Sequence, residues 1–259
     1  MKKTVYYGKQ QFLSKLWREV AIKVIEYEER SLNELKLLMK LSHPYIVQLI
    51  DADKQEGNLG DRIYIVMELC SQNLRDYVEK HSFNFENSFR FSGNIVEGLV
   101  FLHRNNVIHR DLKPDNVLIS MDKRSAKLSD FGLCQEIPIG HSGATVSAIG
   151  VGTGGFRAPE TYQNITHVSP SIDVFAFGLV IHFIFSKGKH PYGSNPYECQ
   201  VNITKKPNRD LTQIPQFGRP HVHKREQLTQ LLRQTLDSEP SKRPTMKDIQ
   251  ESAFISGMR

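Results

Sequence analysis

Short apolar runs separated by polar turns dominate the first part of the chain. Residues 4–8 and 19–25 are rich in β-branched and aromatic residues, and they predict a hairpin with its loop around Gln10–Lys15. Residues 46–50 and 63–67 predict two more strands, joined by a polar loop. This alternation of strands and turns indicates a small sheet at the start of the chain.

A helix interrupts these strands. Leu32, Leu35 and Leu38 recur within residues 30–41, so that one face of a helix would be apolar. Ser42-His43-Pro44 follows and ends it, because the residue before a proline is disfavoured in the helical conformation. We therefore predict a β-rich N-lobe with one helix over residues 1–70.

Beyond residue 70 the periodicity becomes mainly helical. Residues 86–104 place Phe91, Ile95 and Leu99 on one side of a helix. The predicted fold class is α+β: a bilobal molecule whose larger, mainly helical C-lobe covers residues 71–259, with a hinge near residue 70, the two lobes forming one domain. The other predicted helices cover residues 73–80, 171–186, 224–236 and 245–252.

The composition is that of a globular domain. Of its 259 residues, 39% are hydrophobic and 24% charged, which allows a sizeable core. The net charge of +6 comes without a basic stripe interleaved with aromatic residues, so a solvated surface is favoured over direct nucleic-acid binding. Cys70, Cys134 and Cys199 form no C-x-x-C pair and indicate free thiols in a reducing compartment, which predicts a cytoplasmic location.

Residues 174–185 form the most apolar run of the chain. Gly178 and His182 interrupt it, and it is shorter than the roughly 20 residues that span a bilayer. The run therefore predicts a buried helix, and no membrane segment is expected in this chain.

The densest group of polar residues lies in Ile108-His109-Arg110-Asp111-Leu112-Lys113-Pro114-Asp115-Asn116-Val117-Leu118-Ile119. Pro114 excludes a regular helix or strand through its centre. Apolar residues at both ends predict a rigid loop anchored in the core. A loop that combines a carboxylate base, a cation and an amide is suited to a phosphate and a metal ion.

A second polar site follows in Lys127-Leu128-Ser129-Asp130-Phe131-Gly132-Leu133. Residues 117–119 and 126–128 predict a strand pair, which would bring Asp111, Asn116 and Asp130 to one edge. Asn116 and Asp130 could then hold Mg²⁺, a hard cation that takes oxygen ligands. Asp111 would remain available as a base.

A lysine inside an apolar strand is the third signal. Lys23 ends Val20-Ala21-Ile22-Lys23, where burial is costly unless the ammonium has partners. Glu34, on the following predicted helix, would supply one and aim the ammonium at a phosphate. The alternative is a surface ion pair, worth only about 0–1 kcal/mol.

Together with residues 152–160 and 171–178, these strings resemble the signature set of the eukaryotic protein kinases, over residues 5–254. The resemblance implies a bilobal protein kinase-like fold that binds ATP and Mg²⁺. It implies catalytic roles for Lys23, Glu34, Asp111 and Lys113, metal binding by Asn116 and Asp130, and nucleotide binding by Val5, Ala21, Lys23, Met67, Glu68, Cys70 and Leu118.

The resemblance also implies structural braces around the site. Ala158-Pro159-Glu160 would end the activation segment, with Glu160 paired to Arg243. Asp173 would hold the backbone of the loop that carries Asp111. His109 and Phe131 would pack in the interior and not take part in the chemistry.

Lys113 and Thr153 are typical of kinases that phosphorylate serine and threonine. Several short strings, among them Glu68-Leu69-Cys70 and Ser129-Asp130-Phe131-Gly132-Leu133-Cys134, resemble the inositol-requiring-enzyme family of unfolded-protein sensors, which join a kinase to a ribonuclease, and the related ribonuclease L. This narrower resemblance implies a protein substrate, a homodimer, and the cytosolic part of a membrane-anchored protein.

The glycine-rich phosphate loop of the family is missing upstream of Lys23. If Val5 is the valine that ends G-x-G-x-x-G-x-V, Lys3 occupies the position of the third glycine. Two explanations compete: a truncated first strand and loop, which we expect, or a degraded nucleotide site. The second would make the chain a nucleotide-binding pseudokinase that regulates a partner or an absent ribonuclease domain; a scaffold that binds no nucleotide is a third alternative.

Arg110 beside Asp111 invites a phosphate to pair with it. Ser142, Thr145 and Ser147 lie in the segment between Asp130 and Glu160 and could accept that phosphate. We therefore predict trans-autophosphorylation of this segment, against the alternative of ordinary solvated hydroxyls.

Overall fold

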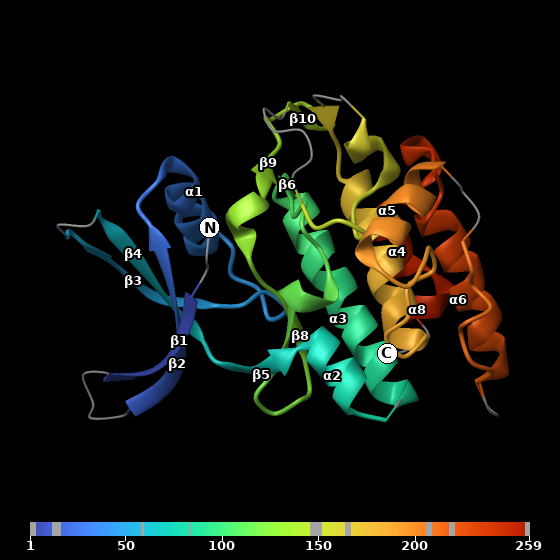
Figure 1. The fold of residues 1–259 in the computed structure, drawn as a ribbon, viewed down its shortest axis with the longest axis horizontal. Coiled ribbons are helices and arrows are strands. Elements are labelled where there is room, and N and C mark those ends of the chain that lie inside the picture. The colour runs from blue at the N-terminus through green and yellow to red at the C-terminus, as the bar shows by residue number, and fades with distance from the viewer. Residues whose placement is uncertain are drawn as a thin grey trace.

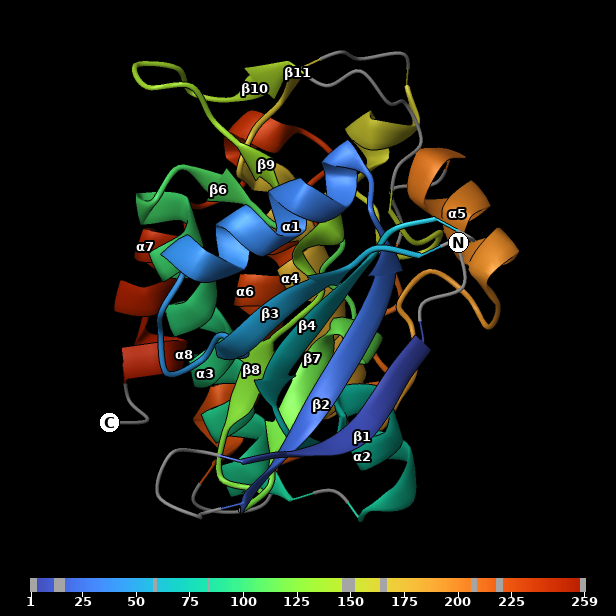
Figure 2. The ribbon, with the colours of Figure 1, turned by 90° about the vertical axis from the view of Figure 1, so that its left-hand side faces the viewer.

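The α+β fold is confirmed in a computed structural model, which describes residues 4–11, 17–57, 60–82, 84–145, 152–163, 167–205, 209–217 and 221–256. Figure 1 shows a smaller part built on a sheet and a larger, mainly helical part. The sheet has the order β1-β2-β4-β3, and all its pairs are antiparallel. Its elements are β1 (Thr4–Gln11), β2 (Trp17–Glu26), β3 (Leu49–Gln55) and β4 (Arg62–Glu68), and α1 (Glu29–Lys40) lies along one side of it (Figure 2).

The larger part is organised around α3 and α4, which contact each other; α3 also contacts α7 and α8, and α4 contacts α6. Its helices are α2 (Leu74–Lys80), α3 (Phe85–Arg104), α4 (Ser171–Phe185), α5 (Pro196–Lys205), α6 (Val222–Thr235), α7 (Met246–Glu251) and α8 (Ala253–Ser256). Its short strands are β5 (Cys70–Asn73), β6 (Val107–Ile108), β7 (Val117–Ser120), β8 (Ala126–Leu128), β9 (Gln135–Glu136), β10 (Ala144–Thr145) and β11 (His167–Val168).

The predicted pair of strands that carries the polar loop is present. β7 pairs with β8 in antiparallel register, with Val117 opposite Leu128 and Ile119 opposite Ala126. β5 joins the other edge of β7, so that the segment leaving the first sheet is paired with the strand that follows the polar loop. This small sheet positions the loop over residues 108–116 against the first sheet.

Two predictions about secondary structure were wrong. The strand placed at residues 46–50 begins only at Leu49 and continues through polar residues to Gln55; upstream of it, Ile46 makes an isolated bridge to Leu128. Pairing with β4 sets this strand, and none of its seven residues is fully buried, so its sequence carries no apolar run. Helix α5 was not predicted, because only Cys199 and Ile203 of its residues are buried.

The apolar run at residues 174–185 forms a buried helix, as predicted. Every residue of α4 from Ile172 to Phe185 is buried. Among the residues that the structure describes, no helix is long and apolar enough to cross a membrane. α4 instead forms the centre of the core, in contact with α3 and α6.

Burial of His182 inside α4 gives the fold a pH dependence. Its side chain is 0% exposed, and burial lowers its pKa to about 4. The native state thus keeps His182 neutral while the unfolded chain takes up a proton as the pH falls through about 6.5, so stability is lost from there down to pH 4. We expect this histidine to lower the free energy of unfolding by about 2 kcal/mol from pH 7 to pH 5.

Urea unfolding at both pH values, for the wild type and His182→Gln, measures this contribution. The glutamine variant should show the smaller loss at pH 5, whatever its stability at pH 7. His141→Gln, at an exposed position, is the matched control. An equal loss in the wild type and His182→Gln would contradict the expectation.

Candidate active site

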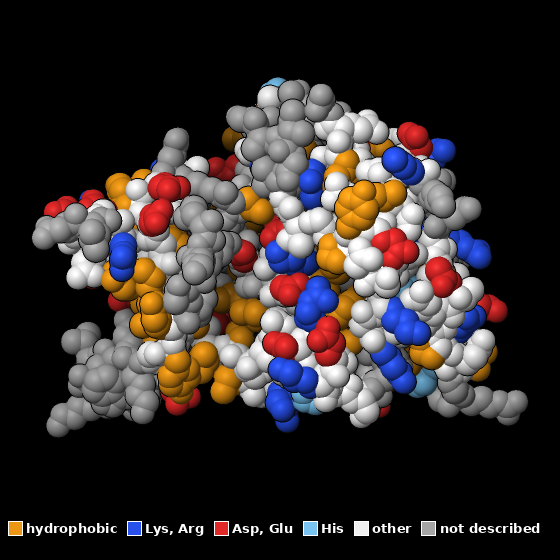
Figure 3. Space-filling view, viewed as in Figure 1, with side chains coloured by type: hydrophobic (Ala, Val, Ile, Leu, Met, Phe, Trp, Pro, Cys, Tyr) orange, Lys and Arg blue, Asp and Glu red, His pale blue; other side chains and the backbone are white. Residues whose placement is uncertain are grey.

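A cavity of about 350 Å³ lies where the first sheet meets the helical part. Figure 3 shows the groove between the two parts, with hydrophobic side chains exposed in it. Of the residues predicted to bind a nucleotide, Ala21, Lys23, Met67, Glu68, Cys70 and Leu118 all line this cavity. Val5 lies in β1 opposite Lys23, but its side chain is outside the described part of the chain.

Several cavity residues were missed by the sequence reasoning. Leu38 and Val47 add apolar surface, and Gln72, Asn73 and Ser129 add polar groups. Leu38 was assigned only to the apolar face of its helix, and Val47 to a strand that is not formed there. No local pattern separates a residue that lines a cavity from one that packs in the core.

The carboxylate of Glu68 is engaged by other groups of the protein. Its carboxylate accepts hydrogen bonds from Nζ of Lys127 at 2.7 and 2.8 Å and from the backbone N–H of Gln48 at 2.8 Å. A polar contact of Glu68 with a nucleotide would therefore come from its backbone groups. Burial raises the pKa of the neighbouring Cys70 thiol to about 12, so the thiol is neutral.

Lys23 is the buried cation of the cavity, with 5% of its surface exposed. Its ammonium pairs with the carboxylate of Glu34 on α1 and lies 3.1 Å from Oδ1 of Asp130. Burial alone would lower the pKa of Lys23, but the two carboxylates outweigh it and raise the pKa. Lys23 is therefore charged, and the pair expected from the sequence is buried and not a surface contact.

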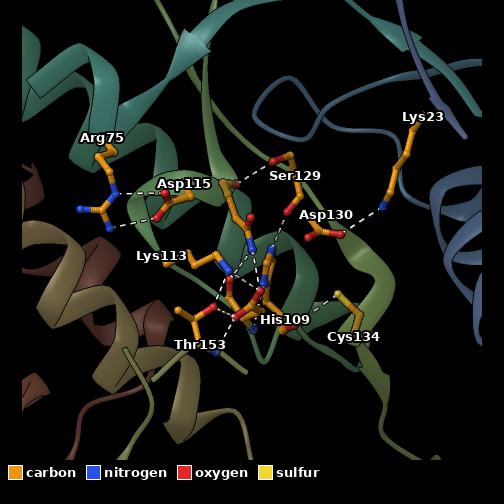
Figure 4. A network of polar contacts seen from close by, with 11 residues as sticks. Lys23, Arg75, His109, Lys113, Asp115, Ser129, Asp130, Cys134 and Thr153 are labelled. Carbon is orange, nitrogen blue, oxygen red and sulfur yellow. Dashed lines mark hydrogen bonds and ion pairs between the residues drawn. The ribbon is translucent and has the colours of Figure 1, made fainter. Parts of the chain in front are cut away.

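Asp111 is held by hydrogen bonds on both carboxylate oxygens, and two of the donor residues, Lys113 and Thr153, are labelled in Figure 4. Oδ1 accepts from the backbone N–H of Thr153 at 2.9 Å and from its hydroxyl at 2.8 Å. Oδ2 accepts from Nζ of Lys113 at 3.0 Å and from Nδ2 of Asn116 at 2.9 Å. Lys113 also donates to the Thr153 hydroxyl. The carboxylate of Asp111, the ammonium of Lys113 and the hydroxyl of Thr153 are therefore each hydrogen-bonded to the other two.

The backbone around Asp111 is braced by a buried carboxylate. Asp173 is 1% exposed and accepts from the backbone N–H groups of His109 at 2.8 Å and Arg110 at 2.9 Å. Nε2 of His103 lies 2.9 Å from the same carboxylate. Arg110 has a φ of 67°, a left-handed conformation that is unfavourable for a residue other than glycine. The predicted brace is present and holds this strained turn in place.

Asn116 and Asp130 are the residues that could hold an oxygen-seeking cation. Both line the cavity, and Nδ2 of Asn116 donates to the Asp111 carbonyl, which orients its amide oxygen as an acceptor. In the described part of the chain no group of three or more metal-binding side chains occurs. Two side chains fit Mg²⁺, which in proteins is commonly held by one or two of them together with substrate phosphates.

The segment that carries Thr153 is anchored at its far end. Glu160, in the 3₁₀ turn Pro159–Tyr162, accepts from both terminal nitrogens of Arg243 at 2.6 and 2.8 Å, as the sequence led us to expect. Arg243 also donates to the carbonyls of Ser171 and Asp237. Ser142 and Thr145 are exposed, and Ser147 lies outside the described residues.

Comparison with known proteins agrees with this geometry. The family model described as "Protein kinase domain" matches residues 5–255. Serine/threonine-protein kinase/endoribonuclease IRE1b of Arabidopsis thaliana is 32% identical over 252 residues, which cover 83% of this chain and 27% of that protein. Serine/threonine protein kinase OSK3 of Oryza sativa subsp. indica is 30% identical over 248 residues, covering 91% of this chain and 45% of that protein.

A third relative is the sensor for unfolded proteins in the ER ire1 of Schizosaccharomyces pombe. It is 30% identical over 267 residues, which cover 90% of this chain and 24% of that protein. The chain thus spans less than half the length of each of these relatives.

Proposed function

The chain belongs to the protein kinase domain family, and from this premise we propose that it transfers the γ-phosphate of ATP to serine and threonine hydroxyls of a protein substrate. The contact between Asp111 and Thr153 supports this proposal most strongly. The Thr153 hydroxyl donates to Oδ1 of Asp111 at 2.8 Å, beside the ammonium of Lys113. A substrate serine or threonine presents the same group, so base and cation are arranged around the kind of hydroxyl that the reaction requires.

Each polar residue has a role in the proposed transfer. Asp111 orients the substrate hydroxyl and accepts its proton as the new P–O bond forms and ADP leaves. Lys113 neutralises charge on the transferred phosphoryl group. Lys23, aligned by Glu34, positions the α- and β-phosphates. Mg²⁺ held by Asn116 and Asp130 would neutralise further phosphate charge.

We place this activity in a sensor of the unfolded-protein-response type. Two of the relatives are, by their names, a kinase/endoribonuclease and a sensor for unfolded proteins. In such a protein this chain is the cytosolic kinase module, two copies pair, and one phosphorylates the segment of the other that carries Ser142, Thr145 and Ser147. The exposure of Ser142 and Thr145 supports this step.

The alternative is a nucleotide-binding pseudokinase that regulates a partner or a ribonuclease domain. It is favoured by one observation: Gly8 is the only glycine before Lys23, so the printed sequence has no glycine-rich phosphate loop. Against it stands the presence of Lys23, Asn116 and Asp130 at one cavity, with Asp111 hydrogen-bonded to Asn116.

Incubation with Mg-ATP separates these functions. We expect Mg-ATP to raise the unfolding temperature of the chain and to label a serine-containing protein substrate with phosphate. Mass spectrometry of the same sample should find phosphate on Ser142, Thr145 or Ser147, and its absence from all of them would overturn the autophosphorylation step alone. Stabilisation by Mg-ATP without phosphate transfer would contradict the kinase and support the pseudokinase. The absence of both stabilisation and transfer would support a scaffold that binds no nucleotide.

A further inference from the structure

A second cavity of about 660 Å³ lies beside the candidate active site. One wall is formed by Gly154, Gly155 and Phe156, which directly follow Thr153, the residue bonded to Asp111. Arg75 of α2 and the loop over residues 188–196 form the other walls. A polypeptide that presents a hydroxyl to Asp111 would therefore have its flanking residues at this second cavity.

The charged residues that line the second cavity are both cations. They are Arg75 and the exposed Lys189, and among the described residues no carboxylate lines it. Two carboxylates that do not line the cavity lie nearby, one paired with Ser194 and one beside Arg75. Oε2 of Glu198 accepts from the backbone N–H and hydroxyl of Ser194 at 2.8 and 2.9 Å, and Glu79 lies 3.8 Å from Nη1 of Arg75.

Arg75 is fixed in position while keeping donors for a ligand. Its Nε and Nη2 donate to the two carboxylate oxygens of Asp115, both at 3.0 Å (Figure 4). The Phe183 ring lies under the guanidinium, 5.1 Å from its central carbon. Because a guanidinium has five N–H donors, three remain after the pair with Asp115. Such a planar, anchored group is well suited to a carboxylate or a phosphate.

The same pair separates the two cavities. Asp115 lines the cavity proposed for the nucleotide, whereas Arg75 lines the second cavity. Both carboxylate oxygens of Asp115 accept hydrogen bonds from Arg75. Asp115 is therefore engaged with Arg75 and is not available to attract a cationic residue of a substrate.

We propose that the second cavity binds an acidic or phosphorylated side chain of the protein substrate, with Arg75 and Lys189 as the residues that recognise its charge. This inference rests on the proposed kinase function, because it names the substrate class of the same site. Phe156 and Phe183 also line the cavity, and their apolar rings would exclude water from the ion pair between the substrate's anionic side chain and the two cations. A lysine or arginine of the substrate would instead meet two like charges.

A peptide panel tests the specificity. Each peptide carries one serine, with glutamate, phosphoserine, alanine or lysine at a single flanking position, and transfer from Mg-ATP is measured. We expect acidic residues to raise kcat/KM about 5- to 10-fold over alanine at one or more positions, through a lower KM for the peptide. In Lys189→Gln the preference should fall below about 2-fold, and in Lys189→Glu it should shift toward lysine.

Lys187→Gln is the matched control, since it removes the same charge two residues away at an exposed position that does not line the second cavity. The KM for ATP should be the same in every variant. Transfer without an acidic preference, or a preference that Lys189→Gln leaves intact, would overturn the inference and spare the kinase function.

A binding measurement keeps the inference testable if no transfer occurs. Fluorescence anisotropy measures the binding of labelled glutamate and alanine peptides to the wild type, Lys189→Gln and Lys187→Gln, and so tests recognition by the second cavity without any phosphate transfer. Weaker binding of the glutamate peptide to Lys189→Gln alone would support it, whereas equal binding to all three would overturn it.

Discussion

Replacing Asp111 with asparagine is expected to lower the rate of phosphate transfer by about 10²- to 10⁴-fold. Asparagine keeps the shape of the side chain and one acceptor oxygen, but it cannot take a proton from the substrate hydroxyl. It also brings an NH₂ group into a site where Lys113 and Asn116 both donate to the carboxylate. The measurement is transfer to a serine peptide at saturating Mg-ATP.

The effect should be confined to catalysis. Asp111 does not line the cavity proposed for the nucleotide, so Mg-ATP should stabilise Asp111→Asn about as much as the wild type. Asp122→Asn is the matched control, because Asp122 lies exposed in the turn between β7 and β8. A rate for Asp111→Asn within a few-fold of the wild type would show that another group accepts the proton.

Arg243→Ala is expected to reduce the free energy of unfolding by about 3–5 kcal/mol. The Arg243 side chain is 0% exposed, and it donates to both oxygens of Glu160 as well as to backbone carbonyls. Its guanidinium also lies 4.9 Å from the centre of the Phe175 ring. Truncation would leave a carboxylate and several carbonyls without their donor in a space that water reaches poorly.

Two further variants sharpen this test in urea unfolding. Arg243→Lys keeps the charge but cannot donate to both carboxylate oxygens and the carbonyls at once, so it should rescue only part of the loss. Lys242→Ala, at the exposed neighbour, should change stability by no more than about 0.5 kcal/mol. A loss below about 1 kcal/mol in Arg243→Ala would mean that Glu160 finds water or another partner.

The same substitution should affect the active site. Glu160 anchors the segment that begins at Gly152 and presents Thr153 to Asp111. If Arg243→Ala releases this end, the Thr153 contacts would weaken, and the peptide KM should rise in protein that is still folded. Stability and substrate binding are thus coupled through one ion pair.

Local order could be predicted where residues close in the chain determine it. The hairpin of β1 and β2, helix α3 and the pair of β7 with β8 follow from periodicity and turn residues, and all are present. The strand predicted at 46–50 was wrong because its register depends on β4 and not on its own residues. Helix α5 escaped prediction because most of its residues face solvent.

The sequence by itself determined the chemistry available: a buried lysine, a base, an amide and a second carboxylate in strings that resemble one family. It also determined the periodicities that build the two parts of the fold. Only the tertiary structure decided which atoms meet. Three contacts join residues about forty or more positions apart: the hydrogen bond between Asp111 and Thr153, the ion pair of Glu68 with Lys127 and the ion pair of Arg75 with Asp115. Such contacts depend on how helices and sheets pack, and a local pattern of residues does not by itself determine that packing.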